Sequence, residues 1–383
     1  MWVQRRNFFK WAGGILLTLL GGNLFFLLKS KAKKFDGKTG ATPKVGEFLK
    51  EALYWEKIDE ENIRCLLCWR GCIIFSGSKG FCRNRKNIEG KLFTLVYNFP
   101  CAIQVDPIEK EPVFHFLPGT NIFCLSTASC NFRCKFCHNW HISQRHPEEI
   151  NSYYLTPEDI VKLAKKYRCP SISHTYAEPI VHFEYLLDVG KEAKKNGLNF
   201  IVHTNCSLNK EPLKELLNYA DAITVDLKSI SKDYYQKFCR ATPEPVLDNL
   251  ILIRKSNVHL EIVNLLLPVG NSDEKNIKKL VLFIKKNLGD DVPLHFTRFW
   301  PSYKLKNLPP TPVKYLERAE EIAKSEGLKY VYIGNVPGHR ANSTYCPNCG
   351  KRIIHRTHFK VHEIKIKNNR CSYCGNLIPG RFS

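Results

Sequence analysis

The sequence contains 16 cysteines, and most of them fall into three short clusters. The clusters are Cys130, Cys134 and Cys137; Cys65, Cys68, Cys72 and Cys82; and Cys346, Cys349, Cys371 and Cys374. Spacings of two or three residues between cysteines are typical of metal sites in a reducing compartment, whereas a secreted disulfide scaffold is the weaker interpretation. All three clusters are therefore candidate metal sites.

The cluster of three cysteines, in SCNFRCKFCHNW, has the spacing C-x-x-x-C-x-x-C. A 4Fe–4S cluster has four irons, so three thiolates leave one iron open to a small chelating molecule, whereas electron-transfer ferredoxins normally close all four. Phe136 stands directly before the third cysteine and offers an aromatic face on which a purine can lie. The count of three therefore predicts chemistry at an iron–sulfur cluster.

The four cysteines of RCLLCWRGCIIFSGSKGFCRNR suit either structural zinc or an auxiliary iron–sulfur cluster, because both bind thiolates at compact spacing. No ligand position is vacant, which favours a structural metal. The sequence leaves the choice between zinc and a second cluster open.

The two C-x-x-C pairs near the C-terminus predict a zinc ribbon, which is a closed tetrahedral site. Residues 340–383 also contain nine Lys or Arg against one Glu. Such a basic patch could contact RNA or an acidic protein, although a charged face is more often only solvated.

The composition is that of a globular protein. The chain has 383 residues, of which 44% are hydrophobic and 25% charged, and its net charge is +22. These values exclude a disordered chain, a fibrous repeat and a polytopic membrane protein. The positive charge can attract nucleic acid, anionic lipid or an acidic partner, and does not choose among them.

Short apolar runs alternate with longer helical patterns, as in NIFCLST followed by TPEDIVKLAKKY. Seven such strand–helix units predict an α/β fold with a parallel sheet that curls into a full or partial barrel. Thr156 before Pro157 and Thr311 before Pro312 are the expected starts of two helices. The three-cysteine cluster follows the first predicted strand directly.

An uncharged apolar run at residues 11–28 is just long enough to span a bilayer as a helix. RRNFFK before it resembles a twin-arginine export signal, but no cleavage site follows, so we expect an uncleaved membrane anchor. Three Lys or Arg before the run and five after it favour a cytoplasmic body, whereas the twin arginines favour export. We expect a membrane-anchored protein with its body in the cytoplasm, and export as the alternative.

Seven motifs follow one another along the chain in this order: CLLCWRGC, DPIEKEPVFHFLPGT, CNFRCKFCHNW, TYAEP, VDLKS, PLHFTRF and YCPNCG…CSYCG. They give the chain a resemblance to the AmmeMemoRadiSam-system radical S-adenosylmethionine (SAM) proteins, which are relatives of the pyruvate-formate-lyase activating enzymes. The resemblance implies a 4Fe–4S cluster whose open iron binds the amino and carboxylate groups of SAM. One electron then cleaves the sulfonium to methionine and a 5'-deoxyadenosyl radical, which abstracts hydrogen from a substrate.

Polar residues recur where the predicted strands end, and parallel barrels bind their ligands at that end. Glu178 is expected to accept a hydrogen bond from the ammonium of SAM, while Asp226 and Lys228 match the family's aspartate–leucine–lysine element for the ribose and carboxylate. Two positions depart from the family: Ala177 stands where Asn is usual, and Cys206, where Gly is usual, puts a thiol beside the pocket. Other candidates in or near the pocket are His203, Thr204, Asn205, Glu261, Asn264 and His295.

The leading hypothesis is a radical SAM enzyme that uses a 4Fe–4S cluster, SAM and zinc, and that takes electrons from a flavodoxin or ferredoxin. Its substrate is a protein or a small molecule, and AMMECR-type and Memo-type proteins are candidate partners. The alternative is a nucleic-acid-binding zinc-ribbon protein with a structural cluster. We divide the chain into an anchor or signal with its linker (residues 1–46), a Cys-rich region (47–118), the core barrel (119–338) and the ribbon (339–383).

Overall fold

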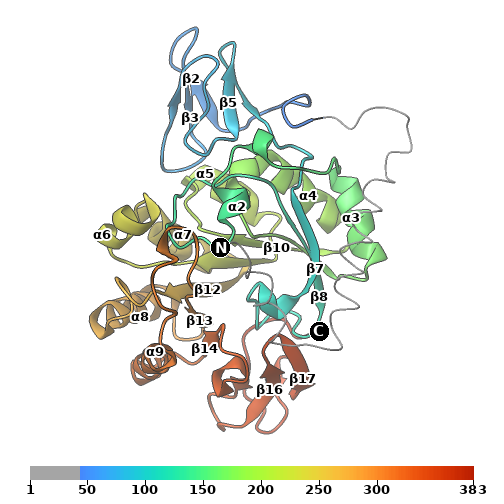
Figure 1. Cartoon of the computed structure of the whole chain (residues 1–383). Helices are drawn as coiled ribbons and strands as arrows, with labels where there is room; N and C mark the ends of the chain where they lie inside the picture. The colour runs from blue at the N-terminus through green and yellow to red at the C-terminus, as the bar shows by residue number, and fades with distance from the viewer. Residues whose placement is uncertain (1–43) are drawn as a thin grey trace, which may run out of the picture. The chain divides into compact units, whose positions relative to one another are not determined.

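The computed structural model describes residues 44–383, and an eight-stranded sheet forms the centre of this part of the chain (Figure 1). The strands are β7 (Ala102–Pro107), β8 (Asn121–Ser126), β9 (Ser171–His174), β10 (Asn199–Thr204), β11 (Ala222–Asp226), β12 (His259–Leu266), β13 (Leu294–Arg298) and β14 (Val331–Gly334). They are ordered β14-β13-β12-β11-β10-β9-β8-β7, with β14 and β7 at the two edges. The sheet is thus an open, partial barrel, as the alternation of strands and helices predicted.

One long helix lies between each two consecutive strands from β8 to β14 (Figure 1). These helices are α3 (Pro157–Lys166), α4 (Phe183–Lys195), α5 (Lys210–Leu217), α7 (Glu244–Arg254), α8 (Glu274–Leu288) and α9 (Val313–Ser325). Shorter helical turns are η1 (Ile108–Lys110), α2 (Trp140–Ser143), η2 (Pro147–Glu149), η3 (Pro179–His182), α6 (Lys232–Tyr234), η4 (Tyr235–Cys239), η5 (Tyr303–Leu305) and η6 (Arg340–Asn342). The strands β8 to β14 are all parallel, because each connection crosses back along the sheet through a helix.

The sheet begins earlier in the sequence than the expected core range of 119–338. β7 pairs with β8 in the antiparallel direction, with Ala102 opposite Ser126 and Pro107 opposite Asn121. The connection between β7 and β8 therefore lies at the end of the sheet where the parallel strands start, which we call the amino end. The opposite end, where these strands finish, is the carboxyl end.

One of the two expected helix starts has the capping geometry that the sequence suggested. Thr156 Oγ1 accepts a hydrogen bond from Asp159 N at 3.3 Å, and the Asp159 carboxylate accepts one from Thr156 N at 3.2 Å. The expectation for Thr311 was wrong in this detail: α9 begins at Val313 without a side-chain cap, and Thr311 Oγ1 donates to Leu266 O at 2.6 Å. Thr311 thus ties the end of β12 to the chain before α9.

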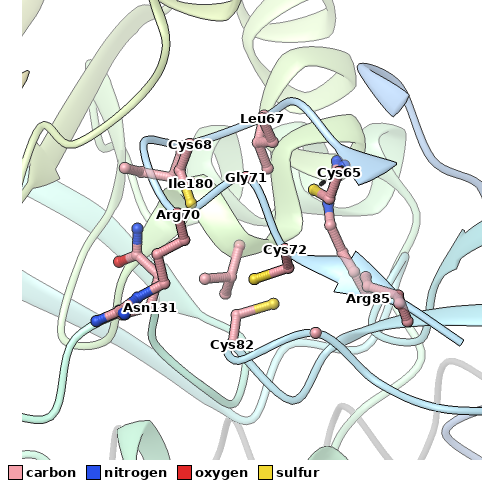
Figure 2. Close-up of a pocket in the computed structure, with 13 residues that line it drawn as sticks. Cys65, Leu67, Cys68, Arg70, Gly71, Cys72, Cys82, Arg85, Asn131 and Ile180 are labelled. Atoms are coloured by element: carbon pink, nitrogen blue, oxygen red, sulfur yellow. Dashed lines mark hydrogen bonds between the residues drawn. The ribbon is translucent and has the colours of Figure 1, made fainter. Parts of the chain in front are cut away.

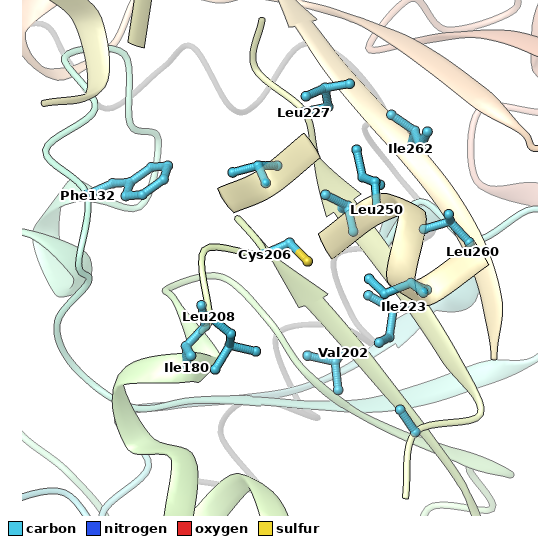
Figure 3. Close-up of a cluster of buried hydrophobic side chains, with 14 of the residues drawn as sticks. Phe132, Ile180, Val202, Cys206, Leu208, Ile223, Leu227, Leu250, Leu260 and Ile262 are labelled. Atoms are coloured by element: carbon cyan, nitrogen blue, oxygen red, sulfur yellow. The ribbon is translucent and has the colours of Figure 1, made fainter. Parts of the chain in front are cut away.

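Apolar side chains of the sheet and the helices form one large core. Figure 3 shows part of it, where Val202 of β10, Ile223 of β11 and Leu260 and Ile262 of β12 lie near Leu250 of α7. Leu250 is fully buried, and burying such a side chain contributes about 1.5–3 kcal/mol to folding. This packing fixes the strands whose carboxyl ends carry the predicted pocket residues.

The segment before the sheet forms two small antiparallel sheets, which carry the first four-cysteine cluster. Their strands are β1 (Lys50–Glu51), β5 (Arg85–Ile88) and β6 (Lys91–Thr94) in one sheet, and β2 (Trp55–Lys57), β3 (Ile63–Cys65) and β4 (Ile73–Ile74) in the other. Trp69 N donates to Ser207 O, Asn209 N donates to Leu67 O, and Cys68 forms a bridge with Leu208. Because residues 207–209 follow the end of β10, this region lies at the carboxyl end of the barrel.

The ribbon follows β14 and contacts the other end of the sheet. Its strands are β15 (Thr344–Tyr345), β16 (Arg352–Thr357), β17 (Lys360–Ile364), β18 (Ile366–Lys367) and β19 (Arg370–Cys371). Arg381 N donates to His115 O at 2.8 Å, and Leu117 N donates to Arg381 O at 2.6 Å. Since His115 and Leu117 belong to the connection between β7 and β8, the ribbon lies at the amino end.

The expected membrane segment at residues 11–28 and the twin-arginine-like motif before it lie outside the described residues. Among residues 44–383, the structure contains no helix that is both long enough and apolar enough to cross a membrane.

Candidate functional site

The loop with Cys130, Cys134 and Cys137 connects the end of β8 to α2, at the carboxyl end of the barrel. Cys134 is buried and the other two cysteines are half-buried. Two backbone hydrogen bonds hold the loop against η4: Arg133 N donates to Cys239 O and Lys135 N donates to Phe238 O, each at 2.8 Å. These hydrogen bonds thus fix the backbone of the loop that carries the three cysteines.

The surroundings of these three thiols disfavour thiolates unless a cation is bound. Burial, followed by the nearby carboxylate of Glu178, raises the pKa of Cys130 well above its usual value. A hydrogen bond with Cys239, together with burial, does the same for the pKa of Cys134. A bound metal reverses this balance because it stabilises the thiolate directly. The donor set therefore fits iron, in which each cysteine binds one metal atom of a cluster.

The Glu178 carboxylate, after β9, accepts three hydrogen bonds from the protein. The donors are Thr204 Oγ1 at 2.5 Å, Asn205 N at 2.8 Å and Ile180 N at 3.3 Å. Burial raises the pKa of Glu178 to about 7, against the lowering effect of these hydrogen bonds. A carboxylate has about four lone-pair positions, so three donors leave about one for a ligand ammonium.

Asn205 links the end of β10 to the three-cysteine loop. Its side-chain amide donates to Asn131 Oδ1 at 2.8 Å, and its carbonyl oxygen accepts from Ser207 Oγ at 2.7 Å. Asn131 follows Cys130 directly in the sequence. The predicted pocket residues Glu178, Thr204 and Asn205 thus form one buried hydrogen-bond network with the loop.

A charged group lies beside this network at the ends of β10 and β11. Asp226 accepts from His203 Nε2 at 3.3 Å and from Lys228 Nζ at 3.0 Å. Burial alone would lower the pKa of His203, but the carboxylates of Asp226 and Glu111 outweigh it and raise this pKa to about 10. Lys228 Nζ also lies 5.7 Å from the centre of the Phe136 ring. The structure therefore brings His203, Asp226, Lys228 and Phe136 together.

His295 lies elsewhere. It is the second residue of β13, near the amino end, and its Nε2 lies 2.6 Å from Glu261 Oε2. The rings of Phe114 and Tyr332 pack against it, and its side chain is only 1% exposed. Asn264 on β12 donates to Leu227 O at 2.7 Å and so supports the chain before Lys228. The structure thus separates His295 and Glu261 from the residues at the carboxyl end.

The two departures from the family pattern take different positions. Ala177 N donates to Ser126 Oγ at 3.1 Å, next to Glu178. Cys206 has a positive φ of 56°, the region that favours glycine, which gives a physical reason for the Gly usual in the family. Its thiol was expected beside the pocket, but the side chain packs into the buried apolar core instead (Figure 3).

Sequence reasoning missed two residues of this site. Glu111 lies 3.6 Å from His203 Nδ1 and accepts from Cys124 Sγ, and it comes from the connection between β7 and β8. Cys239 of η4 is the hydrogen-bond partner of Cys134. Neither residue belongs to a spacing pattern that indicates a site. Each lies in an element that is distant in the sequence from the residue it contacts.

The four N-terminal cysteines line one cavity (Figure 2). Cys65 ends β3, Cys68 and Cys72 lie in the loop before β4, and Cys82 lies before β5.

The four ribbon cysteines converge much more closely. Cys346 Sγ lies 3.6 Å from Cys374 Sγ, and Cys349 Sγ lies 3.9 Å from Cys371 Sγ. All four sulfur atoms lie within 4.8 Å of one another, so this cluster can hold a single metal ion.

Comparisons with known proteins found a matching family profile, similar sequences and similar folds. A sequence profile of the Radical SAM superfamily matches residues 125–284. Uncharacterized protein MJ0808 of Methanocaldococcus jannaschii is 46% identical over 332 residues, which cover 86% of this chain and 99% of that protein. Pyruvate formate-lyase-activating enzyme of Staphylococcus epidermidis is 27% identical over 57% of this chain and 92% of its own length. A solved domain of pyruvate-formate lyase-activating enzyme from Bacteroides vulgatus has a TM-score of 0.39 and 23% identity, covering 43% of this chain and 98% of that domain.

Proposed function

Because the chain belongs to the radical SAM superfamily and is a radical SAM enzyme, we propose that it cleaves SAM at a cluster on Cys130, Cys134 and Cys137. The family implies a 4Fe–4S cluster, which when bound supplies the electron that converts SAM to methionine and a 5'-deoxyadenosyl radical. The observation that carries the proposal is the position of the three-cysteine loop. It follows β8 at the carboxyl end of the barrel, inside the segment that the superfamily profile matches.

The residues around the loop would position SAM and exclude water. Phe136 is 4% exposed and can cover one face of a purine. Lys228 is positively charged beside Cys134 and Asp226, so it would offset the negative charge of the thiolates and attract a ligand carboxylate. The network of Glu178, Thr204 and Asn205 would keep the loop at a fixed distance from this charge. We therefore assign these residues to the binding and positioning of SAM.

Replacing Cys130, Cys134 and Cys137 together with Ala tests the proposal. The anaerobically reconstituted variant should form no 5'-deoxyadenosine from SAM and a low-potential reductant, while the wild type forms it. Cys101→Ala is the matched control, because this half-buried cysteine belongs to none of the three clusters. Continued cleavage by the triple variant would contradict the assignment.

Glu178→Gln tests the role of the carboxylate through its pH dependence. With a pKa of about 7, Glu178 attracts an ammonium only once it ionises, so wild-type affinity for SAM should rise between pH 6 and pH 8. The amide cannot ionise, and the variant should bind SAM more weakly with little dependence on pH. Equal pH profiles for both proteins would assign Glu178 to loop support alone.

We propose a protein as the substrate and a flavodoxin-type or ferredoxin-type protein as the reductant. The relatives named pyruvate formate-lyase-activating enzyme support a protein substrate, because their name states that they activate an enzyme. AMMECR-type and Memo-type proteins are the first candidates to test. Each purified candidate should increase 5'-deoxyadenosine formation and lose a hydrogen atom to it, which deuterium labelling of the candidate would detect.

We propose zinc for the ribbon site. Tetrahedral zinc with Zn–S distances of about 2.3 Å places its sulfur ligands about 3.8 Å apart. The Cys346–Cys374 and Cys349–Cys371 sulfur separations of 3.6 Å and 3.9 Å agree with this spacing. Metal analysis of the wild type and of Cys374→Ser should differ by one zinc per chain.

We propose further that residues 11–28 anchor the protein in the membrane and that its body is cytoplasmic. The larger number of basic residues after the apolar run and the cytoplasmic supply of SAM support this arrangement. Protease added to intact spheroplasts should leave the body uncut. Digestion there, abolished when Arg5 and Arg6 are changed to Lys, would show export instead.

A further inference from the structure

The cavity lined by the N-terminal cysteines is a candidate metal site apart from the three-cysteine loop. Besides Cys65, Cys68, Cys72 and Cys82, its walls include Arg70, Arg85 and Asn131 and the apolar side chains of Leu67, Ile74, Ile180 and Val181. Figure 2 shows the four cysteine side chains around one space, with the sulfur atoms of Cys72 and Cys82 near each other in this view. The four thiols thus share one site.

The spacing of the sulfur atoms distinguishes the possible metals. A single zinc ion draws its four thiolates to about 3.8 Å from one another. Among residues 44–383, the ribbon is the one group of three or more Cys, His, Asp or Glu ligand atoms within 4.8 Å of each other. No three of the N-terminal sulfur atoms are therefore that close together. In an iron–sulfur cluster the thiolates bind different irons, so they stand around the cluster rather than around one ion.

Two arginines line the cavity, and one of them, Arg85, also forms a buried ion pair with Glu184. Arg85 is 1% exposed, donates to Cys65 Sγ at 3.7 Å, and has a buried Nε without a hydrogen-bond partner. Arg70 forms a second part of the wall, and its Nε donates to Asn131 O at 2.9 Å. Hydrogen bonds from such groups to sulfur stabilise a cluster that four thiolates make negative.

We propose that Cys65, Cys68, Cys72 and Cys82 hold an iron–sulfur cluster, not a zinc ion. The site is coupled to the three-cysteine loop through Asn131, which lines the cavity, hydrogen-bonds to Cys68 and follows Cys130 in the sequence. The protein would then carry two clusters at the carboxyl end of the barrel and one zinc at the amino end. The assignment rests on the arrangement of these four cysteines and their neighbours and does not require SAM cleavage.

Metal and sulfide analysis of the full chain, purified in detergent and reconstituted anaerobically, tests the proposal. In the variant with Cys130, Cys134 and Cys137 changed to Ala, we expect two or four irons with equal sulfide, and one zinc, per chain. Adding Cys72→Ser and Cys82→Ser should remove the iron and sulfide and leave the zinc. Two zincs without sulfide in the triple variant, or no metal beyond the ribbon zinc, would overturn the proposal.

The wild type gives a second measurement if these variants fail to fold. Two clusters predict about six or eight irons and one zinc per chain, whereas one cluster with zinc at the N-terminal site predicts about four irons and two zincs. Cys101→Ala should leave either count unchanged. Since this count is made without SAM, a failure of SAM cleavage and a failure of the second cluster are distinguishable.

Discussion

The two four-cysteine clusters have the same number of ligands but differ in spacing and in position. The ribbon sulfur atoms converge on one point at the amino end of the barrel, whereas the N-terminal sulfur atoms surround a cavity at the carboxyl end. In barrels of parallel strands, the carboxyl end carries the chemistry and the amino end carries stability. A count of cysteines therefore does not define a metal site, because the elements that carry the cysteines determine how closely their sulfur atoms approach.

Each cluster region is also joined to the barrel by a buried ion pair. Arg85, after the N-terminal cysteines, pairs with Glu184 of α4, and both side chains are almost fully buried. Arg356 of the ribbon pairs with Glu109 of η1 at 3.4 Å, and both side chains are fully buried. Arg85 also contacts Cys65, whereas Arg356 forms its side-chain hydrogen bonds with Glu109, Thr344 and Phe114. Both regions thus depend on the barrel, but only the N-terminal pair contacts a cysteine of its cluster.

The largest expected effect is the loss of the ribbon metal. Cys346→Ser or Cys371→Ser should release zinc and open residues 344–382, because structural zinc contributes about 10–16 kcal/mol of apparent binding free energy. Hydrogen exchange should increase in β16 and β17 and around Phe114, which shares an apolar cluster with both cysteines.

Cys72→Ser is the matched change in the other region. It should increase exchange within residues 63–88 and leave β16 and β17 protected. If either substitution increased exchange in both regions, the two ends of the barrel would unfold together, and the expected independence of the two regions would be wrong.

A smaller loss of stability is expected when either buried ion pair is removed. Arg85→Met and Arg356→Met each leave a buried carboxylate without its partner, which should lower the free energy of unfolding by about 3–5 kcal/mol. Urea denaturation measures this loss, and Arg318→Met, which removes an exposed pair with Glu274, should leave the free energy of unfolding almost unchanged.

The two arginine variants should differ in their spectra, because only Arg85 contacts a cysteine of its cluster. Arg85→Met should change the absorption or electron paramagnetic resonance signal of the N-terminal site, since it removes a donor to Cys65. Arg356→Met should leave that signal and the zinc content unchanged. Identical spectra for Arg85→Met and the wild type would mean that Arg85 serves folding alone.

The smallest of these effects concerns the chain that follows the ribbon strands. Gly380 has a φ of +136°, and a Cβ there would lie 2.3 Å from His115 O. Gly380→Ala should therefore cost about 2 kcal/mol of stability and increase exchange at His115, while SAM cleavage continues.

Gly350→Ala is the control for this substitution. Its φ is +69°, but no atom lies within 4 Å of the position of a Cβ, so only backbone strain of about 1 kcal/mol is expected. Equal losses for both variants would show that the close contact with His115 contributes nothing.

Local patterns in the sequence were sufficient for most strands and helices of the barrel. The strand–helix alternation predicted the partial barrel, and Thr156 with Pro157 predicted the start of α3, because these signals depend on neighbouring residues. The antiparallel strand β7 was not predicted, since its pairing with β8 depends on the connection of residues 108–120 that precedes the predicted barrel.

The missed parts of the site depend on contacts between residues far apart in the sequence. Glu111 reaches His203 from another element, and the thiol of Cys206 turns into the core because its backbone takes a left-handed conformation. The choice of metal for the N-terminal cluster depended on distances between sulfur atoms, which spacing along the chain does not give.

The contact between the ribbon and the connection of β7 and β8 also determines the order in which the protein can be completed during synthesis. His115 binds Pro379 O, 264 residues later in the sequence, and Phe114 and Tyr332 are covered by ribbon residues such as Ile353 and Ile378. A ribosome makes the cysteine loop, all strands of the barrel and their helices before residue 378 emerges. The nascent chain therefore passes through a stage in which its reactive end is formed while apolar side chains at the other end are still exposed, and this interval is when chaperones are most needed.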